Sequence, residues 1–201
     1  MKDKNGDNFY AALRALKRGN VVVFPTETFY GLGADALNED AVERVVSLKG
    51  RNPESPIAVI VAEEAMLAQV VTQVSPVAKK LIHQFWPGPL TLILPAKPDL
   101  PAPLLNREGK IGVRVSSHPT AMRLTSELDR PITATSANPS SKEPARTIQE
   151  ARDYFAEQIE VFLDGGTLAG KTGSTVVEVI DNRLKIIREG EIGSKELKRW
   201  V

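Results

Sequence analysis

The stretch VVVFPTETFYGLGADA, residues 21–36, decides the fold. Its first residues, Val21–Phe24, are β-branched or aromatic, and such a short continuous apolar run predicts a strand that is buried on both faces. The chain then leaves the strand through the polar residues 26–28, and we expect turns at Gly31 and Gly33. Hydroxyls, a carboxylate and glycines just beyond a strand occur where open α/β sheets bind ligands. A plain connecting loop would have the same composition.

Length and composition indicate an ordinary globular protein. The chain has 201 residues, of which 42% are hydrophobic and 25% charged, and we expect one domain over residues 1–201. It contains no cysteine, which excludes disulfides, thiolate metal sites and cysteine nucleophiles. Its histidines are His83 and His118, too few for a histidine-based metal cage, so we expect no protein metal site. Catalysis would therefore use hydroxyls, carboxylates, lysine, arginine and backbone groups.

The charge pattern and the N-terminal sequence suggest where the protein works. The first residues mix charges with short apolar steps and lack the apolar core of a signal peptide. We expect a cytoplasmic protein without a membrane span. The formal net charge is +1, from 26 basic and 25 acidic residues, which argues against coating of nucleic acid.

Helical and strand patterns alternate along the chain. Apolar spacing predicts helices over residues 7–18, with Phe9, Leu13 and Leu16 on one face, and over residues 38–48 and 76–85. Asn38 is expected to cap the second of these, and Thr147 is expected to cap a further helix that runs through Phe155. Apolar runs predict strands over residues 57–62, 90–94 and 111–115, with adjacent strands at 174–180 and 184–188. Because the last strands are adjacent, we predict an α/β fold with a twisted, mixed sheet flanked by helices.

Polar clusters follow several of these predicted strands, and their cations and hydroxyls could hold a polyanion. Neither the GxxxxGK[ST] phosphate loop nor the GxGxxG dinucleotide motif is present. Lys49 and Arg51 could instead only stabilise the preceding helix, because cations at a helix C-terminus interact favourably with its dipole. Arg114 lies in an apolar run, so it needs a partner, either a carboxylate or a bound anion. A serine hydrolase centred on Ser136 is disfavoured because no GxSxG surrounds it.

In order along the chain, PTETFYGLGADA, KGR, WPGPLT, IGVRVSSHP, TSAN, LDGG and GSTVVEV resemble the YrdC-like threonylcarbamoyl-adenylate synthases. The resemblance covers about residues 21–188 and looks like the short, single-domain form. It implies a cationic cavity in which L-threonine, bicarbonate and ATP form threonylcarbamoyl-adenylate and pyrophosphate. The product would supply the threonylcarbamoyl modification of tRNA beside the anticodon. It also implies a downstream tRNA-modifying transferase complex as a partner and leaves direct tRNA contact open.

The resemblance assigns roles to individual positions. It implies that the catalytic residues are Lys49, Arg51, Ser136 and Asn138. It implies that ATP binds Lys49, Arg51, Ser55, Lys110, Ser136 and Arg188, with Mg²⁺ carried by the nucleotide rather than by a protein cage. It implies that L-threonine binds Thr28, Tyr30, Arg114, Ala134 and Ser174.

The sequence also departs from the family pattern. Ser55 stands where many relatives have asparagine, Ile60 where many have histidine, and Ala145 where many have serine. These differences leave two alternatives open. One is a paralogue that acts on RNA and should bind it with steep salt dependence. The other is an enzyme of the same fold that uses another amine or carbamoyl substrate.

Overall fold

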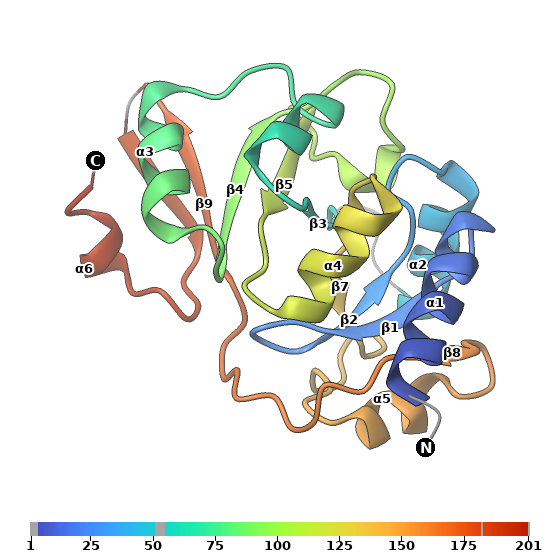
Figure 1. The fold of residues 1–201 in the computed structure, drawn as a ribbon. Helices are drawn as coiled ribbons and strands as arrows, with labels where there is room; N and C mark the ends of the chain where they lie inside the picture. Colours follow the sequence, from blue (N-terminus) through green and yellow to red (C-terminus); the bar gives the residue numbers. More distant parts are fainter. Residues whose placement is uncertain (1–3, 51–54, 182, 201) are drawn as a thin grey trace.

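The computed structural model describes residues 4–50, 55–181 and 183–200. Helices and strands alternate through most of this part of the chain, as the sequence predicts (Figure 1). The helices, with 3₁₀ turns marked η, are α1 (Lys4–Lys17), α2 (Glu39–Lys49), η1 (Glu64–Gln69), α3 (Pro76–Phe85), η2 (Ala102–Leu104), α4 (Pro119–Leu128), α5 (Ile148–Phe155) and α6 (Ser194–Leu197).

The strands form two mixed sheets, a division that the sequence pattern does not predict. A four-stranded sheet has the order β7-β2-β1-β8, and a six-stranded sheet has the order β10-β9-β4-β5-β3-β6. Parallel pairs join β1 to β8, β3 to β5 and β4 to β9. The predicted mixed α/β class is confirmed. The strands are β1 (Val22–Pro25), β2 (Tyr30–Gly33), β3 (Val59–Ile60), β4 (Leu90–Pro95), β5 (Lys110–Arg114), β6 (Ile132–Thr133), β7 (Thr135–Ser136), β8 (Val161–Phe162), β9 (Thr175–Ile180) and β10 (Arg183–Arg188).

The segment after β1 corrects one prediction. Residues 30–33, expected to turn, form the buried strand β2, which pairs antiparallel with β1. Its glycines leave room for the ring of Phe24: a Cβ on Gly33 would lie 2.8 Å from Phe24 Cε1, and one on Gly31 would lie 3.2 Å from the same atom. Both glycines therefore serve close packing across a hairpin rather than a turn.

Helix starts follow the capping signals in the sequence. Asn38 Oδ1 accepts a hydrogen bond from the amide of Ala41 at 3.1 Å and caps α2. Thr147 and Glu150 form a reciprocal capping box at the start of α5. These caps fix the ends of helices that flank the sheets.

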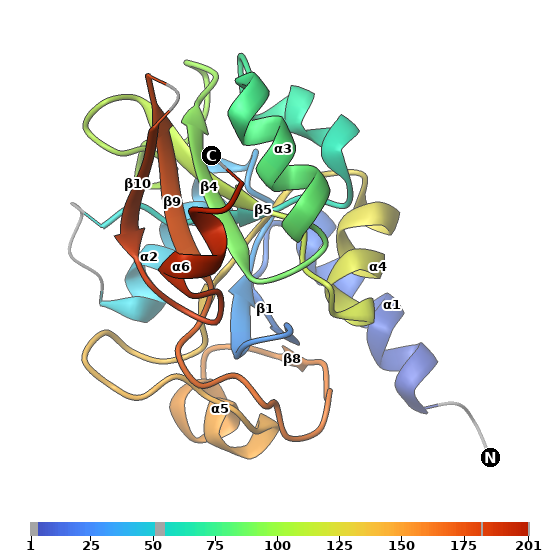
Figure 2. The same cartoon turned by 90° about the vertical axis from the view of Figure 1, so that its left-hand side faces the viewer.

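Two apolar cores hold the layers together. One contains Phe9, Leu13 and Leu16 of α1, packed with Phe24 of β1 and Leu124 of α4, and Figure 1 shows α1 and α4 side by side. The other core lies around the six-stranded sheet and includes α2 and α3. Figure 2 shows α3 packed beside β4 and β5, with α5 at the far end of the molecule. No helix within the described residues is long and apolar enough to cross a membrane.

Candidate functional site

A cavity of about 320 Å³ lies where the two sheets approach each other. Its wall comes from the β1–β2 hairpin, the end of α2, and strands β4, β5, β9 and β10. It brings together many of the residues singled out from the sequence: Thr28, Tyr30, Lys49, Lys110, Arg114, Ala134, Ser136, Ser174 and Arg188.

The electrostatics of this wall are one-sided. The cations in it are Lys49, Lys110, Arg114 and Arg188, and the described lining residues include no aspartate or glutamate. Hydroxyl groups of threonine and serine make up much of the remaining polar surface. Such a wall favours an anionic ligand.

Arg114, the last residue of β5, has a carboxylate partner. Its Nη1 donates to Glu27 Oε1, and the side chains of the pair are only 6% and 13% exposed. Burial lowers the pKa of Arg114, the charge of Glu27 opposes that shift, and the charge of Arg188 adds to it. The sequence required a carboxylate or an anion at this position, and the structure supplies Glu27. The polar segment after β1 pointed to a ligand-binding carboxylate, but the pairing of Glu27 with Arg114 was not predicted from the sequence.

Lys49 closes another side of the cavity from the last turn of α2. Its Nζ donates to the Ser136 carbonyl at 2.8 Å and to Asn138 Oδ1 at 3.2 Å. The amide of Ser140 donates to the Lys49 carbonyl at 2.7 Å. Asn138 is buried but does not line the cavity. These contacts bind the end of the helix to β7 and the loop after it, so Lys49 of the KGR stretch meets Ser136 and Asn138 of the TSAN stretch.

Lys110 lies at the opposite end of β5 from Arg114. Its Nζ donates to Glu108 at 2.5 Å and also to Glu178 of β9, which is buried. The hydrogen bond to Glu108, followed by that to Glu178, raises the pKa of Lys110. Lys110, Gly112 and Arg114 alternate along β5 and all face the cavity.

Arg188 of β10 and Ser174, just before β9, contact each other in the cavity wall. Arg188 Nη2 donates to the Ser174 carbonyl at 2.8 Å and contacts its Oγ at 3.3 Å. Thr91, which the sequence analysis did not single out, contacts Ser174 Oγ through its own hydroxyl at 2.9 Å. Thr91 ends the WPGPLT stretch, but its contact with Ser174 depends on the pairing of β4 with β9, which no local pattern predicts.

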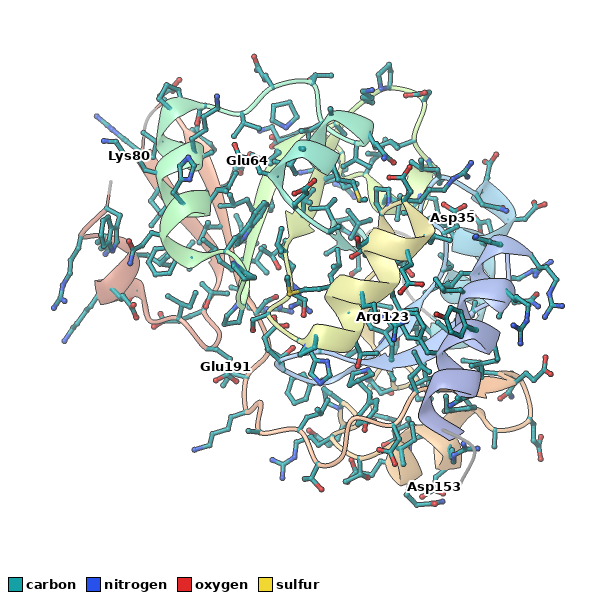
Figure 3. All side chains as sticks on the ribbon, in the orientation of Figure 1. Asp35, Glu64, Lys80, Arg123, Asp153 and Glu191 are labelled. Carbon is teal, nitrogen blue, oxygen red and sulfur yellow. The ribbon has the colours of Figure 1, made fainter. Side chains whose placement is uncertain are left out.

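The segment before Ser174 is held by a carboxylate. Glu191 Oε1 accepts from the amides of Lys171 and Thr172 at 2.6 and 2.9 Å, and these bonds lower the pKa of Glu191. Figure 3 labels Glu191, and it also shows Lys80 of α3 and Asp153 of α5 pointing outward on other parts of the surface.

Tyr30 is fully buried, and its hydroxyl faces away from solvent. The hydroxyl donates to the Gly166 carbonyl at 2.7 Å and accepts from the Gly165 amide at 2.9 Å. Burial is the main cause that raises the pKa of Tyr30, so the hydroxyl stays protonated. The ring borders the cavity while its polar tip anchors the turn after β8.

The other positions of interest lie elsewhere. Ser55 is exposed and outside the cavity wall, and Arg51 falls outside the described residues. Ile60 and Ala145, two of the departures from the family pattern, are fully buried and do not line the cavity. Within the described residues there is no group of three or more His, Cys, Asp or Glu side chains that could hold a metal ion.

Two named proteins are similar in sequence to this chain. Threonylcarbamoyl-AMP synthase of Pyrococcus abyssi is 34% identical over 92% of the chain and 55% of its own length. The enzyme of the same name from Halorhodospira halophila is 38% identical over 77% of the chain and 81% of its own length. The chain thus spans about half the length of the Pyrococcus relative and most of the Halorhodospira one.

Solved structures share the fold. The P. abyssi Sua5 structure complexed with L-threonine superposes with a TM-score of 0.93 at 32% identity, over 100% of this chain and 59% of that one. Escherichia coli YciO superposes with a TM-score of 0.85 at 27% identity, over 96% and 94% of the two chains. The sequence model of the Sua5/YciO/YrdC family, described as telomere recombination, matches residues 14–190. The chain therefore belongs to the Sua5/YciO/YrdC family.

Proposed function

We propose that this protein is an L-threonylcarbamoyl-adenylate synthase, which joins L-threonine, bicarbonate and ATP and releases pyrophosphate. The observation that carries the proposal is the cavity wall, which holds cations from α2 and the six-stranded sheet, hydroxyls from both sheets, and no carboxylate among its described residues. The names of the relatives and the threonine complex of the P. abyssi protein support the same reaction.

The two ends of β5 suggest how the substrates lie. Lys110 and Arg114 are four residues apart, so their Cα atoms are separated by roughly 13 Å. We place the threonine carboxylate at Arg114, bordered by Thr28, Ala134 and Ser174. We place the triphosphate of ATP toward Lys49, Lys110 and Arg188, together with Arg51, a position that remains a prediction. Because Ser55 is exposed and outside the cavity wall, it would contact only the part of the nucleotide nearest the solvent.

The chemistry requires no covalent enzyme intermediate. The threonine ammonium and bicarbonate give a carbamate, with loss of water and a proton. A carbamate oxygen then attacks the α-phosphorus of ATP in line, and the bond to the β-phosphate breaks so that pyrophosphate leaves with the electron pair. Lys49 and the hydroxyl of Ser136 would stabilise charge on the phosphates. Asn138 acts through Lys49, whose ammonium it holds.

The cavity contributes mainly position and charge. Because the described wall holds no carboxylate, Mg²⁺ would be bound by phosphate oxygens of the nucleotide rather than by a protein cage. When bound, the ion would offset phosphate charge. The contact with a downstream tRNA-modifying transferase, a direct contact with RNA, and the cytoplasmic location stay predictions of the sequence.

Pyrophosphate release from ATP tests the proposal. We expect release only when threonine and bicarbonate are both present, since the carbamate is the nucleophile. Serine and other amino acids serve as substrate controls. Release that is indifferent to threonine would contradict the proposal and point to another amine on the same scaffold.

A further inference from the structure

Glu27 lies behind Arg114 rather than in the cavity. Its neighbours Thr26 and Thr28 line the cavity, whereas Glu27 does not. One carboxylate oxygen, Oε1, accepts from Arg114, and the other, Oε2, accepts from the hydroxyl of Ser116. Both oxygens of this carboxylate are therefore held by the segment that ends β5.

The support continues behind Ser116. Its Oγ also accepts from the backbone amide of His118 at 3.2 Å, at the start of α4. The β1–β2 loop is thus tied through one carboxylate to the end of β5 and to the helix that follows. His118 itself is half-buried, and burial lowers its pKa while the charge of Glu27 opposes the shift. A neutral His118 leaves Arg114 as the positive partner of Glu27 in this cluster.

Arg114 needs such support for a physical reason. It is buried beside a second guanidinium, that of Arg188, which disfavours its charge. A guanidinium has five N–H donors in a planar fork, and the described contact with Glu27 engages Nη1. Fixing one arm of the fork sets the plane of the whole group, and that plane decides whether a ligand carboxylate can bind through two parallel hydrogen bonds.

We propose that Glu27 is a positioning residue for the amino-acid end of the site. It holds the plane of Arg114 so that the remaining N–H groups face the carboxylate of an α-amino acid in the cavity. This inference rests on the proposed function, because it takes the amino acid to be threonine. A carboxylate that merely competed with the substrate for Arg114 would have the opposite effect when removed.

Steady-state pyrophosphate release with Glu27→Gln distinguishes a positioning role of Glu27 from competition with the substrate for Arg114. The amide keeps the size of the side chain and removes its charge. We expect the KM for threonine to rise about tenfold or more, the loss typical of one misaligned charge-assisted contact. We expect the KM for ATP to change by less than about twofold. A threonine KM that is unchanged or lower would overturn the proposal.

Glu178→Gln is the matched control. It removes a carboxylate from Lys110, the cation at the other end of β5, and this carboxylate is more deeply buried than that of Glu27 (side chains 5% and 13% exposed). We expect no rise in the KM for threonine in this variant. An equal rise in both variants would show a general electrostatic or folding effect, and it would also overturn the proposal.

A second variant covers the case in which Glu27→Gln does not fold. Ser116→Ala leaves Arg114 and Glu27 in place but frees one carboxylate oxygen, so we expect a threonine KM raised about threefold with an unchanged ATP KM. No change would count against the proposal. The wild-type protein is measured in parallel: if its release does not require threonine, the proposed function fails, whereas an active wild type with insensitive variants contradicts only the role of Glu27.

Discussion

Tyr30→Phe tests whether a residue of the cavity wall acts through its hydroxyl on the substrate or on the fold. The hydroxyl donates to the Gly166 carbonyl at 2.7 Å, with Asp164 Oδ1 as a second acceptor at 3.2 Å, and it accepts from the Gly165 amide; the residue is fully buried. Each net hydrogen bond contributes about 0.5–1.5 kcal/mol, so the variant should lose about 1–3 kcal/mol in the free energy of unfolding. For a chain of this size that corresponds to a Tm lower by roughly 2–12 °C.

Thermal unfolding followed by circular dichroism measures this loss, and pyrophosphate release measures the effect on threonine. Because the hydroxyl is engaged by the turn after β8, we expect the KM for threonine to change by less than about twofold. Tyr10→Phe, an exposed tyrosine, is the matched control and should shift the free energy of unfolding by less than about 0.5 kcal/mol. An unaltered Tm together with a raised threonine KM would refute the reasoning.

Three further predictions follow from single contacts. Arg114→Lys keeps a cation near Glu27 but loses the planar fork, so we expect the KM for threonine to rise at least about tenfold in pyrophosphate release; an unchanged KM would place the carboxylate elsewhere. Burial lowers the pKa of His118 below its usual 6.5, so the unfolded chain takes up the proton first and stability falls as pH drops below about 6.5. His118→Asn should reduce that pH dependence in denaturant titrations between about pH 5 and 8, and an identical pH profile would argue against it. Gly170→Ala would place a Cβ 2.1 Å from the carbonyl oxygen of Thr28. We therefore expect the free energy of unfolding, measured by denaturant titration, to fall by about 1–3 kcal/mol. An unchanged free energy of unfolding would contradict the close packing of these two loops.

Local patterns in the sequence predicted much of the fold. The apolar stripe of Phe9, Leu13 and Leu16 predicted α1, and the signals at Asn38 and Thr147 predicted the starts of α2 and α5. Each of these features depends on residues within a few positions of one another. The mixed α/β class also followed, because the adjacent strands β9 and β10 had to pair as a hairpin.

The β2 strand and the two sheets could not be predicted in the same way. Gly31 and Gly33 look like turn residues, and only the ring of Phe24 across the hairpin explains why a strand needs glycine there. The pairing of β4 with β9 joins residues 85 positions apart, for example Leu90 and Thr175. Such long-range registers leave no local pattern in one sequence.

The sequence predicted the cations of the candidate site but not the carboxylates that pair with them. The resemblance pointed to Lys49, Lys110, Arg114 and Arg188, and the structure brings them to one cavity. The carboxylates behind Arg114 and Lys110 depend on how the β1–β2 loop and β9 lie against β5. The need for a partner was visible in the sequence, but its identity required the fold.

The most direct test of the synthase proposal is the mass of the product formed from ATP, threonine and isotopically labelled bicarbonate. We predict threonylcarbamoyl-adenylate whose mass carries the bicarbonate label, with no such species when threonine is omitted. A nucleotide product without the label, or none despite measurable ATP binding, would contradict the proposal that the cavity joins a threonine carbamate to the α-phosphate of ATP.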